Sequence, residues 1–324
     1  MKKKLEIIWM DDSPLRKGAA SNLGKRLKAN VAFIDLTVEA IIDMLSIDEP
    51  DLIMIDHNLP NMISEEFKKG STVAAVLREK WPVCPIVGIT AQPINTIDSQ
   101  NRSLYEEVFS FDNISEYDET ILSIARSFKA LRAKKPKTIE GIIKLFGAPL
   151  EDKEKLKQIL PSVLKTNLHE KSLILNLSTW VRKVLLERPG FLYDSLWAAT
   201  YLGIKETSLS KVKSIFKSAE YTGIFQDASR KRWWKSQLAT ILASKVAQPG
   251  LPWEKGRLLL PIKKADYSKD WWSSNKEEFP EVVAFTDENM TERHPMKLKY
   301  TKPHPNFEDL LHFEEIRVMD EDAK

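Results

Sequence analysis

The N-terminal part of the sequence predicts an α/β fold in which helices cover both faces of a parallel β-sheet. Between residues 5 and 131, short apolar runs alternate with segments whose apolar residues have helical spacing. Each run is short enough for a strand, and most runs end at an acidic residue or a threonine. Strands and helices that alternate along a chain form a parallel sheet wound on both faces.

The elements of this sheet follow one another in a regular order. The expected strands cover residues 5–10 (LEIIWM), 31–36 (VAFIDL), 51–56 (DLIMID), 85–90 (PIVGIT) and 107–111 (EVFSF). The expected helices cover residues 16–28, 38–45, 71–81 and 119–131. The last of these is amphipathic and closes the series, which gives a flavodoxin-like, doubly wound, five-stranded parallel sheet.

Composition limits the classes of protein. The length of 324 residues is sufficient for two or three domains, and the net charge of +3 gives no strong attraction to nucleic acid or membranes. The single cysteine, Cys84, excludes a disulfide framework and a cysteine-rich zinc site. The N-terminus does not resemble a signal peptide, and no apolar run reaches the roughly 18 residues of a membrane span. We therefore expect a cytoplasmic protein without a membrane partner.

Polar residues follow the predicted strands at the points where the strands end. They are Asp11, Asp12, Asp56, Thr90 and Asp112. Ligands of such sheets bind beyond the carboxyl ends of the strands. Carboxylates that converge there repel one another and raise at least one pKa unless a cation neutralises them. Magnesium is the expected cation, because it prefers carboxylate, carbonyl, water and phosphate oxygens.

Three motifs carry a resemblance to a known family: MDD (10–12), MIDHNLP (54–60) and GITA (88–91). In this order and at these strand ends they resemble the response-regulator receiver family, over about two fifths of the chain. The resemblance implies that Asp56 accepts a phosphoryl group from a histidine kinase or phosphotransfer protein. It also implies that Asp11, Asp12, Asp56 and the carbonyl of Asn58 hold Mg²⁺, and that Thr90 is a switch hydroxyl.

One position departs from the family pattern. Receivers usually carry a lysine after the fifth strand, which pairs with a phosphoryl oxygen. If Phe109 occupies the aromatic switch position, the lysine position falls on Asp112 and the sign of the charge is reversed. Phosphorylation would then be retained in an unusual form, or the domain would be a pseudo-receiver that signals without phosphate.

The second half of the chain shows a different pattern. We expect the receiver to cover 1–132, a basic linker 133–138, a helical output or interaction domain 139–250, and an irregular, β-containing segment 251–324. Residues 191–246 have the outline of a winged helix: a helix, a short turn and a second helix, followed by a strand at 221–225 (YTGIF). The basic residues of this outline could contact DNA phosphates. These basic residues are Lys211, Lys213, Lys217, Arg230, Lys231 and Arg232. The alternative is a small helical domain whose lysines form a solvated surface.

Tryptophan is concentrated in this half, where seven of the nine residues lie between Trp180 and Trp272. Such residues anchor either a core or a protein interface. No catalytic constellation accompanies them, and His294, His304 and His312 have no metal-ligand spacing, so we do not expect an enzyme. The expected function is a two-component response regulator that signals through its C-terminal module. A DNA-binding transcription regulator and a phosphoryl-buffering or adaptor protein are the alternatives.

Overall fold

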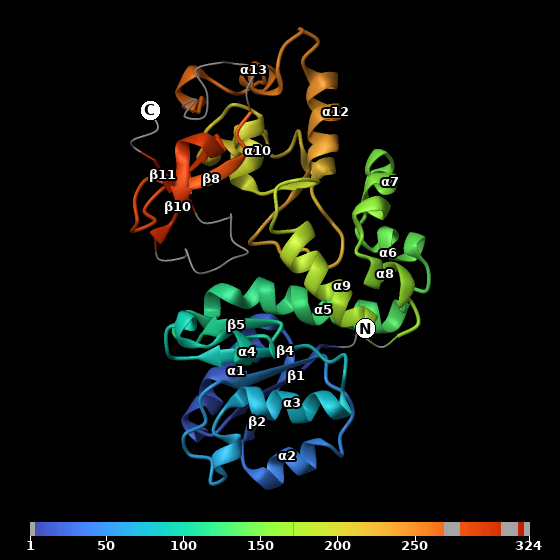
Figure 1. Ribbon diagram of the computed structural model, residues 1–324, viewed down its shortest axis with the longest axis vertical. Helices are drawn as coiled ribbons and strands as arrows, with labels where there is room; N and C mark the ends of the chain where they lie inside the picture. The colour runs from blue at the N-terminus through green and yellow to red at the C-terminus, as the bar shows by residue number, and fades with distance from the viewer. Residues whose placement is uncertain (1–3, 171, 269–278, 306–316, 321–324) are drawn as a thin grey trace. The chain divides into compact units, whose positions relative to one another are not determined.

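The computed structural model describes residues 4–170, 172–268, 279–305 and 317–320 (Figure 1). The chain forms two compact units. The first comprises Met1–Glu187 and Thr222–Lys231, and the second comprises Arg188–Tyr221 and Arg232–Lys324. The first unit therefore extends well beyond residue 132, and it includes a segment from the middle of the second half.

The predicted sheet is confirmed. Its strands are β1 (Glu6–Asp11), β2 (Asn30–Asp35), β3 (Leu52–Asp56), β4 (Ile86–Thr90) and β5 (Glu107–Ser110). All neighbouring strands are parallel, and their order in space is β2-β1-β3-β4-β5. Every residue of β3 and β4 is buried, as expected for central strands of a parallel sheet covered on both faces. The order reverses at β1, so β1 and β3 flank the point at which ligands bind in such folds.

Helices cover both faces of this sheet (Figure 1). They are α1 (Lys17–Leu27), α2 (Val38–Met44), α3 (Gly70–Lys80), α4 (Ser99–Arg102) and α5 (Asp118–Lys134). Ile8 and Met10 of β1 pack in one core with residues of α2 and α3, whereas the alternate residue Trp9 is fully buried on the other face. Among the described residues, no helix is both long and apolar enough to cross a membrane.

More helices complete the first unit. They are α6 (Ile139–Leu145), α7 (Leu150–Ile159), α8 (Ser162–Thr166) and α9 (Leu173–Trp180), which continues as a π-helical turn (Val181–Leu185). Arg182 of this turn donates to the backbone carbonyl of Glu106 and, at 2.8 Å, to the carboxylate of Glu107 in β5. These helices are thus fastened to the sheet, which is why the expected boundary at 132 does not separate two compact units.

The segment 222–231 belongs to the first unit although the residues on both sides of it belong to the second. Phe225 donates its backbone N–H to Ser127 Oγ of α5 at 2.6 Å, and its ring lies edge-to-face on Phe128 at 5.7 Å between centroids. Asp227 accepts a hydrogen bond from Thr120 Oγ1 at 2.6 Å. The segment is therefore held against α5, the last helix of the predicted receiver.

The second unit combines short helices with two small sheets. It contains β6 (Leu192–Tyr193), α10 (Ser195–Tyr201), α11 (Leu209–Val212), β7 (Trp233–Trp234), α12 (Lys235–Lys245), α13 (Pro252–Arg257), β8 (Val282–Phe285), β9 (Arg293–Met296), β10 (Thr301–Pro303) and β11 (Arg317–Met319). Strands β6 and β7 pair with each other, and the other four form a sheet in the order β10-β11-β8-β9. This confirms a mostly helical second part with a small β-containing segment.

The winged-helix outline expected over 191–246 does not match this arrangement. The second helix of the outline is reduced to α11, which has four residues. The following stretch 221–225 forms no strand, because Phe225 has a left-handed backbone (φ 60°) and its segment packs on α5 in the first unit. The elements of a winged helix are therefore not assembled within one compact unit.

The described tryptophans build cores instead of exposed surfaces. Trp197, Trp233, Trp234 and Trp253 are each at most 6% exposed, and Trp180 is buried against Phe146 in the first unit. Trp271 and Trp272 lie outside the described residues. Of the two roles expected for these aromatics, core packing is the one that the described residues fill.

Gly70, at the start of α3, provides a test of the close packing behind β3. A Cβ atom there would lie 2.1 Å from the backbone oxygen of Asp56. We expect Gly70→Ala to lower the free energy of unfolding by about 1–3 kcal/mol, because the helix or the strand end must move. In Gly18→Ala the added Cβ has nothing within 4 Å, so this control should be neutral or gain up to about 1 kcal/mol. Equal stabilities of the two variants in urea unfolding would contradict this packing.

Candidate functional site

The predicted acidic residues gather at the carboxyl edge of the sheet. Asp11 is the last residue of β1, Asp12 follows it, and Asp56 is the last residue of the neighbouring strand β3. All three are buried, with exposed fractions of 1%, 7% and 9%. The adjacent strand ends thus bring several carboxyl groups together in a poorly solvated place.

Backbone N–H groups orient these carboxylates. Ser13 donates to Asp11 Oδ1 at 2.9 Å, and Asn58 donates to Asp56 Oδ1 at 3.1 Å. Asn61 donates to Asp12 Oδ2 at 2.6 Å, which ties the loop after β3 to the end of β1. Each carboxylate is thus held in one orientation, and the backbone N–H groups use only part of its capacity to accept hydrogen bonds.

Burial makes the ionised site energetically unfavourable. It raises the pKa of Asp56 to about 6, and the neighbouring Asp11 and Asp12 add to this shift, while the Asn58 N–H and Arg16 oppose it. Burial also raises the pKa of Asp11, against the opposing effects of the Ser13 N–H and Arg16. The raised pKa expected from the sequence is present, although desolvation contributes more to it than the repulsion between carboxylates.

Thr90 ends β4 and follows Ile89, the residue paired with Asp56 in the sheet register, and it is completely buried. Its Oγ1 accepts the backbone N–H of Gln92 at 3.0 Å, and its carbonyl accepts the N–H of Phe111 at 2.7 Å. Thr90 therefore lies at the same edge of the sheet as the acids, and its backbone carbonyl connects it to the segment that follows β5.

Phe109 in β5 and Asp112 after it were expected from the sequence at the aromatic switch position and the lysine position of a receiver. Phe109 is 1% exposed and stacks on Tyr117, with centroids 4.6 Å apart, so it is a core residue here. Asp112 is exposed. In the sheet register, Ser110 is the residue opposite Thr90. An acidic group at position 112 thus does not lie in the buried site.

Arg16 was not among the site residues expected from the sequence. This residue ends the 3-10 turn η1 (Pro14–Arg16), and its Nε lies 4.0 Å from Asp11 Oδ2. Its guanidinium carbon lies 3.3 Å from the centroid of the Phe111 ring. A single arginine in a loop carries no recognisable motif, but its position five residues after Asp11 could have indicated a role at the same edge.

The donor set suits a hard cation. Asp11 Oδ2 is buried and has no hydrogen-bond partner among the described residues, and Asp56 carries a carboxylate whose ionisation is opposed by burial. Oxygen donors of this kind are the ligands that Mg²⁺ prefers. The described residues contain no preassembled group of three or more His, Cys, Asp or Glu side chains that could hold a metal. A magnesium ion would therefore draw on the Asn58 carbonyl and water in addition to the acids.

His57 and Cys84 have structural roles. Burial lowers the pKa of His57, whose Nδ1 lies 3.2 Å from the hydroxyl of Tyr105, so its ring is neutral near pH 7. Cys84 is completely buried in the core. His294 Nε2 donates to the Glu292 carboxylate at 3.2 Å, and His304 Nε2 donates to the Glu288 carbonyl at 2.8 Å. His312 lies outside the described residues.

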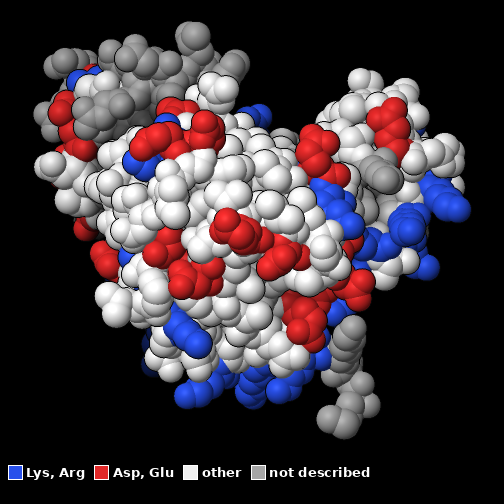
Figure 2. All heavy atoms as spheres, turned by 90° about the horizontal axis from the view of Figure 1, so that it is seen from below, with Lys and Arg blue, Asp and Glu red and all other residues white. Residues whose placement is uncertain are grey.

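The basic residues of the winged-helix outline are divided between the two units. Lys211 pairs with Asp266, while Lys213 and Lys217 are exposed in the second unit together with the half-buried Arg232. Arg230 and Lys231 belong to the first unit, so neither unit by itself carries all six residues. The face seen in Figure 2 carries acidic side chains across its middle and basic side chains along its lower edge.

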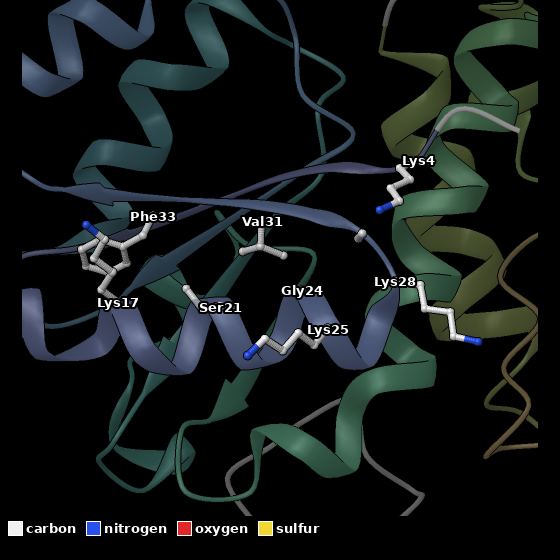
Figure 3. A pocket seen from close by; sticks show the side chains of 10 residues that line it. Lys4, Lys17, Ser21, Gly24, Lys25, Lys28, Val31 and Phe33 are labelled. Atoms are coloured by element: carbon white, nitrogen blue, oxygen red, sulfur yellow. The ribbon is translucent and has the colours of Figure 1, made fainter. Parts of the chain in front are cut away.

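A separate basic hollow lies between α1 and the edge strand β2 (Figure 3). Its volume is about 560 Å³, and its lining includes Lys4, Lys17, Lys25 and Lys28. None of the three edge carboxylates lines it. The hollow is therefore not part of the acidic site.

No protein-family model matches the chain, and no curated protein matches it. Solved structures similar to its N-terminal part are response-regulator receiver domains. The receiver of an HD domain-containing protein from Pseudomonas fluorescens Pf-5 is 16% identical and matches 41% of this chain and 96% of its own, with a TM-score of 0.35. The receiver domain of NarL from Mycobacterium tuberculosis is 19% identical, over 38% of this chain and 98% of its own, with a TM-score of 0.32.

A third similar structure is the response regulator TrrA from Thermotoga maritima, in complex with Mg²⁺-BeF. It is 21% identical and matches 38% of this chain and 99% of its own, with a TM-score of 0.31. At identities this low, the similarity concerns the fold of the N-terminal two fifths only. The roles of single residues depend on the geometry described above.

The raised pKa of Asp56 predicts a pH-dependent effect of Asp56→Asn in metal-free buffer. An acid whose folded pKa is about 6 and whose ordinary value is 3.8 binds its proton more tightly in the folded state, so its ionisation destabilises the fold as pH rises from about 4 to 6. The asparagine can still accept the Asn58 N–H. We expect the variant to gain about 1–3 kcal/mol in unfolding free energy at pH 7.5, and much less at pH 4.5. Urea unfolding with EDTA measures both, and an equal gain at the two pH values would contradict the assignment.

Proposed function

We propose that this protein is a cytoplasmic response regulator of a two-component or phosphorelay system, whose first unit accepts a phosphoryl group on Asp56. The observation that carries the proposal is the placement of Asp56. Its buried carboxylate ends β3 beside Asp11 and Asp12 and has Thr90 at the next strand end. A desolvated carboxylate is a better nucleophile than a hydrated one, provided that it is ionised.

The proposed chemistry is a transfer between two carriers. One oxygen of the Asp56 carboxylate attacks the phosphorus of a phosphohistidine, the P–N bond breaks, and the imidazole nitrogen leaves with the electron pair and takes up a proton. The product is an acyl phosphate on Asp56. With a pKa of about 6, most Asp56 side chains are ionised at pH 7.5 and available for attack.

A bound Mg²⁺ would supply charge neutralisation for the transferred oxygens. The residues that would hold it are Asp11, Asp12, Asp56 and the carbonyl of Asn58. Asp12 is held toward this edge by Asn61, and Asp11 has an oxygen that no hydrogen bond satisfies among the described residues. The protein's own contribution is to bury and orient these oxygens.

The proposed output runs through α5. Thr90 is bonded to the Phe111 backbone, and Tyr117, which stacks on Phe109, directly precedes α5. The segment 222–231 is held on α5 through Ser127, and its two ends continue into the second unit. A shift of Thr90 toward a phosphoryl group would change how α5 packs on the sheet. It would thereby change the contacts that hold the segment 222–231 on α5. The proposed partners are a histidine kinase or phosphotransfer protein on the input side and a protein that binds the second unit on the output side.

The test is an intact-mass measurement after incubation with acetyl phosphate and Mg²⁺. We expect the wild-type protein to gain the mass of one phosphoryl group and Asp56→Asn to gain none. Asp35→Asn is the matched control, because Asp35 ends β2, the edge strand of the same sheet, but is exposed. It should react like the wild type. Labelling of all three proteins, or of none in any metal condition, would refute phosphoacceptor chemistry at Asp56.

A second readout of the same samples tests the output. The Phe225 and Ile224 amides are bonded to Ser127 Oγ and to the carbonyl of Leu145, so they should exchange slowly with solvent. Phosphorylation should change their exchange rates. Unchanged rates in fully phosphorylated protein would refute this route while leaving phosphorylation intact.

A further inference from the structure

The acidic edge contains one basic side chain whose position none of the preceding roles explains. Arg16 stands five residues after Asp11, at the end of the turn η1, and its side chain is 22% exposed. Its Nη1 is buried and has no hydrogen-bond partner among the described residues. A buried guanidinium nitrogen without an acceptor is costly, and such groups are usually satisfied by an acceptor or a ligand.

The guanidinium is fixed in place from two sides. Its carbon lies 3.3 Å from the centroid of Phe111, whose ring in turn makes an edge-to-face contact with the buried Trp9, at 6.2 Å. The backbone of Phe111 is bonded to the carbonyl of Thr90. The turn that carries Arg16 directly follows Ser13, whose backbone N–H donates to Asp11 Oδ1. The packing on Phe111 therefore positions Arg16 relative to the ends of β1 and β4, in addition to its long ion pair with Asp11.

The ion pair with Asp11 does not satisfy either partner. The separation of 4.0 Å between Arg16 Nε and Asp11 Oδ2 is too long for a hydrogen bond, and Asp11 Oδ2 is also without a hydrogen-bond partner among the described residues. One atom of this pair thus requires a donor or a cation, and the other requires an acceptor. A cation together with an oxyanion meets both requirements, whereas a cation alone leaves the guanidinium unpaired.

We propose that Arg16 is the oxyanion-binding residue of this site, whose Nη1 donates to an oxygen of the phosphoryl group on Asp56. The inference rests on the proposed function, because it requires an acceptor aspartate. It assigns the positive charge of the site to the turn after β1, while Asp112 after β5 stays exposed. A guanidinium suits this task because it is always charged and donates several directed hydrogen bonds to phosphate oxygens.

The charge of Arg16 has opposite effects on the two ions. It attracts an oxyanion and repels a cation at the same edge, so removal of the charge should weaken one and not the other. A purely structural role would weaken both together. This difference in sign makes the proposal testable without knowledge of the natural phosphodonor.

The experiment uses the full chain with beryllofluoride as the phosphoryl mimic, and with Mg²⁺ alone, each titrated by calorimetry. We expect Arg16→Ala to bind beryllofluoride, in saturating Mg²⁺, about 10- to 100-fold more weakly than wild type, the loss of one hydrogen bond to a charged group. The same variant should bind Mg²⁺ alone at least as tightly as wild type. Arg16→Lys should recover part of the beryllofluoride affinity. Lys17→Ala, which removes an exposed charge one residue away, should behave like wild type.

The outcomes separate the inference from the proposed function. Wild-type affinity for beryllofluoride in Arg16→Ala would overturn the role of Arg16 alone. A parallel loss of Mg²⁺ and beryllofluoride affinity in that variant would also overturn it, in favour of a structural role. A wild-type protein that binds no beryllofluoride in saturating Mg²⁺ would overturn the acceptor site, and the assignment of Arg16 with it.

Discussion

Burial of carboxylates at the carboxyl edge of a parallel sheet is the constraint on which this site depends. The fold places the ends of β1 and β3 side by side, and the loops after them cover Asp11, Asp12 and Asp56 almost completely. Desolvation raises the pKa of Asp56 to about 6, more than the neighbouring charges do. A fold that tolerates this cost favours any ligand that neutralises the acids, because binding then removes part of the destabilisation.

The same edge is linked mechanically to the rest of the first unit. Thr90 contacts the backbone after β5, Phe111 packs between Trp9 and Arg16, and α5 follows directly. On its other side α5 holds the segment 222–231, which leads in both directions into the second unit. These contacts are the route by which, in the proposed function, a change of charge at Asp56 would reach residues far away in the sequence. Signalling between distant sites requires a part of the structure that can adopt two arrangements, and a set of packed aromatic side chains can be such a part.

The sequence was sufficient to predict the sheet, since each strand is a short apolar run with an acid or threonine at its end, and the observed strands agree with the expected ones to within one residue at each end. The four-residue helix α4 is too short to produce a helical period, and it was not predicted. The acids and Thr90 were found because strand ends converge in this fold. Arg16 was not, because its role depends on a contact with Phe111, 95 residues away, that no local pattern encodes.

The second half was less predictable for a similar reason. Its tryptophans fit a core or an interface equally well as a sequence pattern, and only the burial of Trp197, Trp233, Trp234 and Trp253 distinguishes the two. The winged-helix outline depended on a strand at 221–225. Long-range packing of Phe225 on Phe128 overrides that local preference.

We infer that the buried carboxylates of Asp11, Asp12 and Asp56 form a cation site. The decisive measurement is the number of protons that the protein releases when it binds Mg²⁺. Calorimetry of metal-free protein in buffers of different ionisation enthalpy gives the protons released per Mg²⁺ bound. We expect roughly half a proton or more to be released at pH 6, close to the pKa of Asp56, and almost none at pH 8. Absence of Mg²⁺ binding, or the same proton release at both pH values, would contradict it.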